Sequence, residues 1–406
     1  MESAAPRRWL SIVGIGEDGV QGLSPVARSL VSGADIVFGG KRHLALAAPL
    51  IRGATRPWPS PFEGAAHEVL AQRGRQVCVL ASGDPYLYGV GAVLARHVDP
   101  SETLVVPAPS AFSLAAARLG WALQECTLVS LHGRALDLVR PHLQPSARVL
   151  VLTSDGDGPA ALARLLAESG FGASRLTVLE ALGGPRERIR ATTAVRFDLG
   201  HVDALNTVAV EVVAGANARV IARAAGLPDA LFEHDGQITK REVRAVTLSA
   251  LAPRRGELLW DIGAGAGSVA IEWMLADVSL RAIAVEAQPD RAARIACNAA
   301  AFGVPGLEIV QGRAPDALKD LPTPDAIFIG GGCDARVLDA AVAALRAGGR
   351  LVVNAVTLET EALLIARHAQ MGGELTRIAI ERAEPLGHMT TWRPALPVAQ
   401  WSWVKP

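Results

Sequence analysis

The sequence is short of cysteine, of net charge and of long apolar runs. Its 406 residues carry no net formal charge, whereas a nucleic-acid-binding protein would normally be basic. The four cysteines form no CxxC pair, so their spacing favours neither a disulfide framework nor a zinc site and fits a reducing cytoplasm. We therefore expect no metal and no nucleic-acid partner. The four are Cys78, Cys126, Cys297 and Cys333.

Apolar segments that could engage a membrane are also missing. No run of about 18 apolar residues predicts a membrane span. Residues 1–16 lack the apolar stretch of a signal peptide, so we expect a cytoplasmic protein with no membrane partner. Arginine outnumbers lysine 36 to 4, which reflects either codon bias or the binding of carboxylate ligands.

Short β-branched runs alternate with alanine-rich helical stretches, a pattern typical of parallel α/β folds. The length suits two domains rather than one core. Residues 214–236 have no strand pattern and predict a linker between domains at 1–213 and 237–406. Strands are predicted at 10–14, 76–81, 103–107, 148–153 and 207–213 in the first domain. In the second domain, seven strands predict one doubly wound sheet, at 257–262, 281–286, 307–312, 325–330, 350–355, 375–381 and 398–404.

A glycine-rich turn follows the first strand of the second domain. Asp261 ends the strand, glycines follow at every second position, and a helix is predicted from Ser268. A dinucleotide fingerprint would need glycine at position 268, and Asp261 would repel a pyrophosphate. S-adenosylmethionine fits better, because its carboxylate suits backbone amides and its ammonium and sulfonium suit an acidic group. A turn without ligand and a nicotinamide site stay open as alternatives. The glycines are Gly263, Gly265 and Gly267.

Later strands of the second domain should bring further groups to the same edge of the sheet. Glu286 ends the second strand, where an acidic residue would hold ribose hydroxyls; a surface glutamate is the alternative. Gly312, Arg313 and Ala314 follow the third strand and could flank the adenine. Residues 324–332 contain the fourth strand and the loop after it. Their small residues leave room for a substrate.

A helix with basic residues precedes the glycine turn. Thr239 and Glu242 have the spacing of a capping box, which predicts the helix start. Lys240 and Arg244 lie four apart and should share one helix face. They form either a solvated basic face or a clamp for an acidic substrate.

Three loops of the first domain also lie after predicted strands. They contain Gly14 in a glycine loop, Gly83 and Asp84 in an SGDP sequence, and Ser110 before a helix. These four residues are candidate ligands of a second S-adenosylmethionine site, although Asp84 could simply cap a helix. A polar turn, EALGGPRERI, follows a later strand.

Together these motifs carry a resemblance. The first half, with VGIGEDG, SGDP, PAPSAFSLAAARLG and LGGPRERI in order, resembles the tetrapyrrole methylase family. The second half, with ITKREVRA, WDIGAGAGSVAIE, GRAPDAL and PDAIFIGG, resembles the decarboxylating methyltransferases of cobalamin biosynthesis. The resemblance implies a first domain of two α/β subdomains and a second, Rossmann-like domain. It also implies a homo-oligomer, a dimer or tetramer.

The resemblance further implies a reaction. A polycarboxylate tetrapyrrole would be methylated at C5 by the first domain and at C15 by the second, which would also decarboxylate the ring C acetate. The meso carbons have enamine character, so alignment matters more than a strong base, and no His–carboxylate dyad is evident. Arg313 and His388 are further candidates for substrate binding, though His388 could be an ordinary histidine. The alternatives are methylation of another acidic molecule and a scaffold that only binds.

Overall fold

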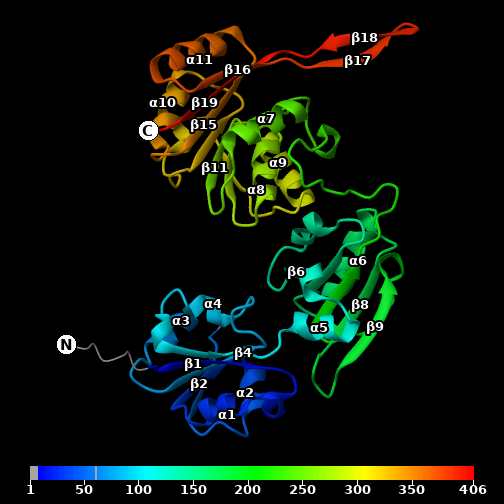
Figure 1. Cartoon of the computed structure of the whole chain (residues 1–406), viewed down its shortest axis with the longest axis vertical. Helices are drawn as coiled ribbons and strands as arrows, with labels where there is room; N and C mark the ends of the chain where they lie inside the picture. Colours follow the sequence, from blue (N-terminus) through cyan, green and yellow to red (C-terminus); the bar gives the residue numbers. More distant parts are fainter. Residues whose placement is uncertain (1–7, 60–61) are drawn as a thin grey trace, which may run out of the picture. The chain divides into compact units, whose positions relative to one another are not determined.

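The computed structural model describes residues 8–59 and 62–406. By its internal contacts the chain forms two compact units (Figure 1). The first comprises the residues up to Leu136 together with His142–Arg219, and the second comprises Val220–Pro406 together with Asp137–Pro141. The predicted domain limits differ from this division by a few residues and stay predictions.

The first sheet of the first unit is parallel throughout, with strand order β3-β2-β4-β1-β5. Its central strands β1 and β4 are almost completely buried, as their β-branched sequences predict. The strands are β1 Leu10–Ile15, β2 Ile36–Gly39, β3 Ala54–Pro57, β4 Val77–Ser82 and β5 Thr103–Val106. The helices are α1 Pro25–Ser32, α2 Lys41–Ala47, α3 Ala65–Leu70 and α4 Val90–Leu94.

The second sheet of this unit is mixed, with order β6-β7-β10-β8-β9. Only β6 and β7 pair in parallel; the other neighbours are antiparallel. Two sheets in one unit confirm the predicted pair of α/β subdomains. The strands are β6 Cys126–Ser130, β7 Arg148–Leu152, β8 Arg175–Glu180, β9 Arg188–Thr193 and β10 Asn206–Glu211, with helices α5 Ala111–Leu119 and α6 Gly158–Glu168.

The second unit contains the predicted seven-stranded sheet, in the order β13-β12-β11-β14-β15-β19-β16. The first five in that order run parallel, and β19 is antiparallel to both of its neighbours. The order reverses at β11, between β12 and β14, which is where such sheets bind ligands. The strands are β11 Leu258–Ile262, β12 Arg281–Glu286, β13 Glu308–Gln311, β14 Ala326–Ile329, β15 Arg350–Ala355, β16 Glu374–Ile378 and β19 Val398–Val404.

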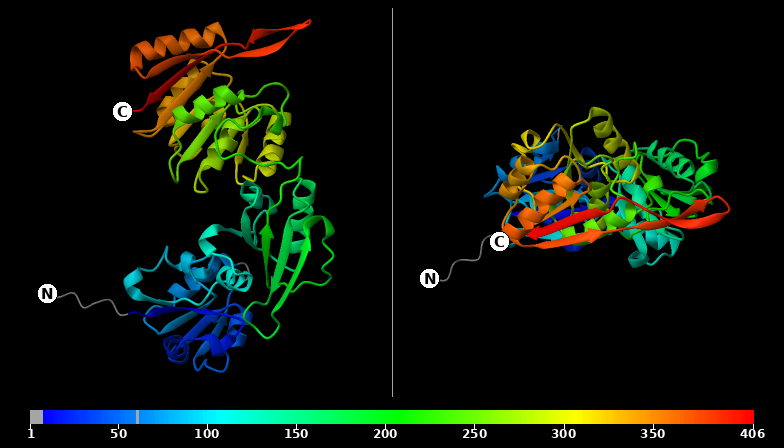
Figure 2. Two further views of the ribbon diagram at one scale, coloured as in Figure 1. Left: turned by 45° about the vertical axis from the view of Figure 1, so that its right-hand side comes forward. Right: turned by 90° about the horizontal axis from the view of Figure 1, so that it is seen from above.

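Helices cover both faces of this sheet (Figure 2). Alternate strand residues feed two cores, so Leu259 packs on the side of α7–α9 and Trp260 on the side of α10 and α11. Ile221, Leu227 and Phe232, from the segment predicted as a linker, belong to the first of these cores. The helices are α7 Arg241–Leu251, α8 Ser268–Ala276, α9 Pro289–Ala301, α10 Ala335–Ala344 and α11 Leu358–Met371.

Two details differ from the prediction. The capping box is wrong: α7 begins at Arg241, Lys240 occupies the N-cap position, and no side chain caps it. A two-stranded hairpin, β17 Glu381–Leu386 and β18 Met389–Pro394, was not predicted because its sequence is polar and mostly exposed. In the described part of the chain, no helix is long and apolar enough to cross a bilayer.

Candidate functional site

A cavity of about 730 Å³ lies in the first unit, where loops from both of its sheets meet. Loops after β1 and β4 and the loop before α5 contribute to it, as expected from the carboxyl ends of parallel strands. Its wall combines aromatic and aliphatic side chains with charged groups. The apolar part includes Trp58, Phe62, Phe112, Leu114, Leu179 and Leu182, and the polar part includes Glu17, Arg42, Asp84, Ser110, His132 and Arg134.

Two of the predicted glycines allow the three loops to approach one another. A Cβ on Gly14 would stand 1.9 Å from the carbonyl oxygen of Gly83 and 2.6 Å from the amide nitrogen of Ala108. Gly83 itself has a φ of +55°, and its Cβ would meet Ser110 at 2.9 Å. Gly83 and Ser110 line the cavity, whereas Gly14 does not. Gly14 therefore acts through close packing behind the cavity.

Asp84 and Ser110 take different local roles. The Asp84 carboxylate accepts a hydrogen bond from the Tyr86 amide at 2.9 Å within a turn, and no helix begins there, so it is not a helix cap. Ser110 is the N-cap of α5 and accepts from the Ser113 amide at 3.1 Å. Both side chains line the cavity, so the structure brings together the predicted residues of this site.

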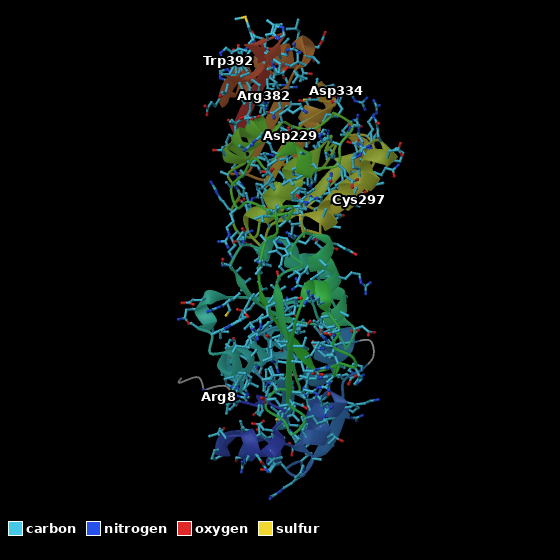
Figure 3. All side chains as sticks on the ribbon, turned by 90° about the vertical axis from the view of Figure 1, so that its right-hand side faces the viewer. Arg8, Asp229, Cys297, Asp334, Arg382 and Trp392 are labelled. Atoms are coloured by element: carbon cyan, nitrogen blue, oxygen red, sulfur yellow. The ribbon has the colours of Figure 1, made fainter. Side chains whose placement is uncertain are left out.

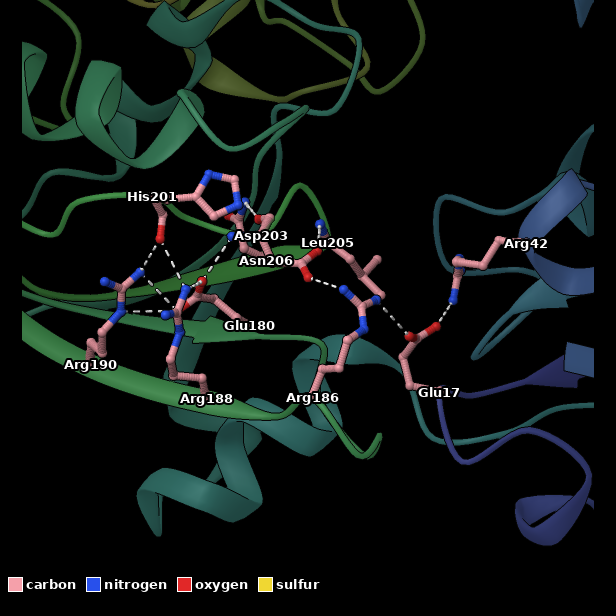
Figure 4. A network of polar contacts seen from close by, with 10 residues as sticks. All are labelled: Glu17, Arg42, Glu180, Arg186, Arg188, Arg190, His201, Asp203, Leu205 and Asn206. Carbon is pink, nitrogen blue, oxygen red and sulfur yellow. Dashed lines mark hydrogen bonds and ion pairs between the residues drawn. The ribbon is translucent and has the colours of Figure 1, made fainter. Parts of the chain in front are cut away.

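Ion pairs hold the loop 201–206 against the cavity (Figure 4). The buried carboxylate of Glu180 pairs with Arg188 and Arg190 and accepts from the Asp203 amide at 2.8 Å. Arg186 bridges Asp203 and Glu17, and Glu17 also pairs with Arg42. The chain of charges therefore runs from the second sheet of the unit to the first.

A histidine and a serine also meet at the cavity wall. His43 of α2 has its Nε2 atom 2.8 Å from the Ser82 hydroxyl oxygen and 2.9 Å from the Arg42 guanidinium. Burial and, to a smaller extent, the positive charge of Arg42 lower the pKa of His43 to about 4. The imidazole is therefore neutral at neutral pH.

The second candidate site is the glycine turn of the second unit. Asp261 at the end of β11 is 1% exposed, and its Oδ2 accepts from the Ala270 amide in the first turn of α8 at 3.0 Å. Its Oδ1 is buried and has no partner among the described residues. Burial and, to a smaller extent, the nearby Glu286 carboxylate raise the pKa of Asp261 to about 7, against the opposing hydrogen bond from the Ala270 amide.

Glu286 organises the turn from the neighbouring strand. Its side chain is buried, so Glu286 is not an ordinary surface glutamate. Its carboxylate accepts from the amides of Gly265 and Gln288, each at 2.9 Å, and its carbonyl accepts from the Gly312 amide at 2.9 Å. Gly263, Gly265 and Gly267 all have positive φ, and a Cβ on Gly263 would stand 2.4 Å from the Gly331 carbonyl oxygen. Larger side chains would therefore disrupt the turn.

Arg244 does not share an exposed face with Lys240, and its predicted contact with substrate is wrong. Its side chain is completely buried, and its guanidinium pairs with Glu272 at 2.6 Å and Asp229 at 3.1 Å. The guanidinium also donates to the carbonyls of Leu227 and Thr239. Arg244 therefore holds the segment before α7 in place, and its complete burial keeps it from a substrate carboxylate.

The remaining candidates are exposed or lie in loops. Lys240 is exposed at the start of α7, Arg313 is exposed after β13, and His388 is exposed in the turn between β17 and β18. Ala314 is half-buried in the loop that contains Gly312. No group of three or more His, Cys, Asp or Glu side chains in residues 8–59 and 62–406 could hold a metal ion. The expected absence of a metal stays a prediction.

Comparisons with known proteins place a different methyltransferase family on each half. Residues 10–197 match the tetrapyrrole (corrin/porphyrin) methylases, and residues 230–405 match the precorrin methyltransferase domain. A protein of Sinorhizobium sp. named precorrin-6Y C(5,15)-methyltransferase [decarboxylating] is 62% identical over 100% of this chain and 98% of its own length. The chain belongs to this family. A protein of the same name from Mycobacterium tuberculosis is 43% identical over 97% of the chain and 99% of its own length.

A solved structure of the C-terminal domain of precorrin-6Y C5,15-methyltransferase from Rhodobacter capsulatus is 52% identical. It covers 46% of this chain and 100% of its own, with a TM-score of 0.44.

Several cavity residues of this precorrin-6Y methyltransferase family member were not predicted from the sequence. His43 and Arg42 lie on α2, which follows a strand that the sequence pattern did not reveal. Ser82 is the first residue of the SGDP sequence, and this membership of the motif was the only available signal.

Proposed function

We propose that the two units divide the work of one decarboxylating methyltransferase. The chain is a member of a family whose relatives are named for methylation of precorrin-6Y at C5 and C15. In the proposed division the first unit methylates C5, and the second methylates C15 and removes the ring C acetate as carbon dioxide. The observation that carries the division is the pair of separate sites, a cavity in one unit and a glycine turn in the other.

The second site fits S-adenosylmethionine through its charge and its backbone. The buried Asp261 carries an unpartnered oxygen, and a cationic ligand would stabilise its charged form. The positive-φ glycines leave space for close approach to backbone amides at the start of α8. Glu286 would hold the ribose hydroxyls, while Gly312 and Ala314 would flank the adenine. When bound, S-adenosylmethionine supplies a methyl group on a positively charged sulfur.

In the first site, Gly83, Asp84 and Ser110 line the cavity and would hold a second S-adenosylmethionine, with Gly14 keeping their loops together. The cavity is large enough for ligands of drug-like size or more. Its apolar wall would exclude water from the tetrapyrrole, and Arg134 on the same wall would face the substrate carboxylates. Aligning the meso carbon with the methyl group is the main task of such a wall.

Substrate contacts in the second unit are proposed for exposed cations. Lys240, Arg313 and His388 would interact with the carboxylates that stay on the tetrapyrrole. The exposed glycines Gly330–Gly332 after β14 leave room beside the turn. Water excluded from around the departing carboxylate would favour its loss, and the conjugated macrocycle would accept the electrons.

The products test the overall reaction that the two units are proposed to share. Full-length protein is incubated with precorrin-6Y and S-adenosylmethionine, and the product is analysed by mass spectrometry and by NMR of the new methyl groups. We expect a mass gain of two methylenes and a loss of one carbon dioxide, with methyl groups at C5 and C15. A product with both methyl groups on carbons other than these would contradict the proposal.

We further propose that the chain forms a homo-oligomer through the hairpin β17–β18. Leu386, Met389 and Trp392 on this hairpin are 60%, 76% and 67% exposed, and Figure 3 labels Trp392. A two-stranded hairpin has only marginal stability alone, and it becomes more stable when another surface packs against its apolar side chains. Trp392 lies on the face opposite to Leu386 and Met389, and a second copy of the same hairpin would cover it with its own Trp392.

Sedimentation of the variant Trp392→Glu tests the oligomer. We expect a smaller species than the parent at the same concentration, whereas Val278→Glu, at another exposed apolar residue, should keep the parental size. Equal sizes for all three proteins would exclude the hairpin as the interface.

A further inference from the structure

The contact between His43 and Ser82 has a defined direction. The Arg42 guanidinium can only donate hydrogen bonds, and it lies 2.9 Å from His43 Nε2 and 2.8 Å from the Ser82 hydroxyl oxygen. Nε2 must therefore be an acceptor, which places the imidazole proton on Nδ1. The Ser82 hydroxyl, 2.8 Å away, can then donate its proton to the Nε2 lone pair.

The surroundings keep the imidazole neutral, with its Nε2 lone pair shared between the Ser82 hydroxyl and the Arg42 guanidinium. Nδ1 of His43 is buried and has no hydrogen-bond partner among the described residues, so no carboxylate pairs with the ring. Burial and Arg42 together hold the imidazole in its neutral form. Glu17 pairs with Arg42 and balances its charge at the same wall. All four side chains line the cavity.

Methylation of C5 leaves a proton to be removed. C5 carries one hydrogen in the enamine, so the carbon that accepts a methyl group holds both the methyl and the hydrogen, with a positive charge spread onto a ring nitrogen. That hydrogen is acidic, and a weak base suffices to remove it. Restoring the conjugated system requires the C5–H bond to break.

We propose that Ser82 and His43 remove this proton. The proposal rests on the assignment of C5 methylation to the first unit. The C5–H electron pair forms the new carbon–carbon double bond and neutralises the ring nitrogen. The proton passes to the Ser82 oxygen while the Ser82 hydroxyl proton passes to His43 Nε2, where the new N–H bond displaces the hydrogen bond from Arg42. The ring becomes an imidazolium and later releases its proton to water. Ser82 touches the substrate, and His43 acts through Ser82.

The test uses a substrate with deuterium at C5 and the full-length protein. In the parent, proton removal is fast and deuterium leaves the rate of C5 methylation unchanged. In Ser82→Ala and His43→Gln we expect the rate to fall about a hundredfold or more and to become slower with deuterium than with hydrogen. Ser82→Thr, which keeps the hydroxyl, should restore the parental behaviour.

A matched serine supplies the control. Ser130 lines the same cavity and is buried, and Ser130→Ala should show no deuterium effect. Thermal unfolding of each variant verifies that the first unit is folded. A folded Ser82→Ala whose C5 methylation stays insensitive to deuterium overturns the proposal, whatever its rate.

A second readout needs neither substrate nor methyl donor. Nitrogen NMR of ¹⁵N-histidine-labelled full-length protein, with His43 assigned through His43→Gln, reports the protonation of each ring nitrogen. At pH 6 we expect a neutral His43 with its proton on Nδ1. A charged ring, or a proton on Nε2, overturns the proposal.

Failure of the first-unit assignment has a different signature. In that case C5 methylation would survive Gly14→Ala. This survival would also remove the basis for the proposed proton transfer in the first unit. If Gly14→Ala abolishes C5 methylation but Ser82→Ala behaves as the parent, only the proton transfer is wrong.

Discussion

The two candidate sites differ in how the chain builds them. The first is a cavity whose wall comes from two sheets, several loops and a chain of ion pairs from Glu17 to Asp203. The second is a single turn between β11 and α8, supported by two buried carboxylates, Asp261 and Glu286. We infer that the first recognises ligands by shape and the second by electrostatics and backbone geometry.

This difference predicts different sensitivities. A site assembled from many loops should depend most on packing contacts that keep the loops together. A site made of one turn over buried charge should depend most on those charges and on pH. Changes in one unit should leave the other active, because each has its own core.

The largest effect is expected for Asp261→Ala. Removing the buried carboxylate eliminates the negative charge beneath the turn and the cap on the Ala270 amide. We expect C15 methylation to be lost while C5 methylation survives, measured by NMR of the labelled methyl groups. Asp339→Ala, at an exposed aspartate of α10, serves as the control. A folded Asp261→Ala that makes both methyl groups at the parental rate would contradict the role.

Gly14→Ala should produce the reverse pattern. Its Cβ would overlap the backbone of Gly83, so the loops around the first cavity must shift. We expect C5 methylation to fall by about a hundredfold, with C15 methylation retained, since misplacement by about 1 Å has effects of that size. Gly200→Ala meets nothing within 4 Å and is the matched control. Equal C5 rates for both variants would show that the cavity tolerates the shift.

Arg244→Ala should affect stability rather than substrate recognition. It leaves the buried Glu272 carboxylate without its cation, which typically costs about 3–5 kcal/mol. We expect lower denaturant resistance of the second unit in an unfolding titration. The double variant Arg244→Met with Glu272→Leu should recover part of that loss, because no charge is left buried. A stable Arg244→Ala with weakened tetrapyrrole binding would instead restore the earlier substrate role.

The pH dependence of ligand binding separates the two sites further. The pKa of Asp261 is raised to about 7, and a cationic ligand prefers the charged carboxylate, so S-adenosylmethionine affinity at the second site should rise with pH up to about 7. In the ligand-free protein the sign is opposite. The folded state binds the extra proton between about pH 4 and 7, so stability falls as pH rises through that window and is level above it.

Calorimetric titration at several pH values checks the binding prediction, and unfolding curves of the parent and Asp261→Asn check the stability prediction. The variant should lack both dependences. Affinity at the second site that is constant from pH 5 to pH 8 would show that the carboxylate stays charged throughout.

The smallest effect is expected for Lys240→Ala. An exposed ammonium contributes about 0.2–1 kcal/mol to a charge contact, so tetrapyrrole affinity for the second unit should fall by less than about tenfold. Added salt should reduce the parental affinity towards that of the variant. Lys41→Ala, at an exposed lysine of the first unit, should leave this affinity unchanged. An unchanged affinity in Lys240→Ala would mark Lys240 as a solvated residue.

Local patterns in the sequence were sufficient to predict that the residues of the second candidate site lie near one another. Asp261, the alternating glycines and Glu286 all lie next to predicted strand ends, and parallel strands bring such ends to one edge. The order of the motifs was sufficient to identify the family. The seven strands of the second sheet were predicted because their apolar or alternating runs are long enough to recognise, although β13 and β16 are only partly buried.

Only the tertiary structure decided where individual charges lie. Arg244 and Lys240 have helical spacing that suggests one face, yet α7 starts one residue later than predicted and Arg244 packs against Glu272 of α8 and Asp229. The contact of His43 with Ser82 joins residues 39 positions apart and depends on the pairing of β2 with β4. Sequence spacing reports neighbours along one element, whereas burial and pairing between elements depend on the packing of the whole unit.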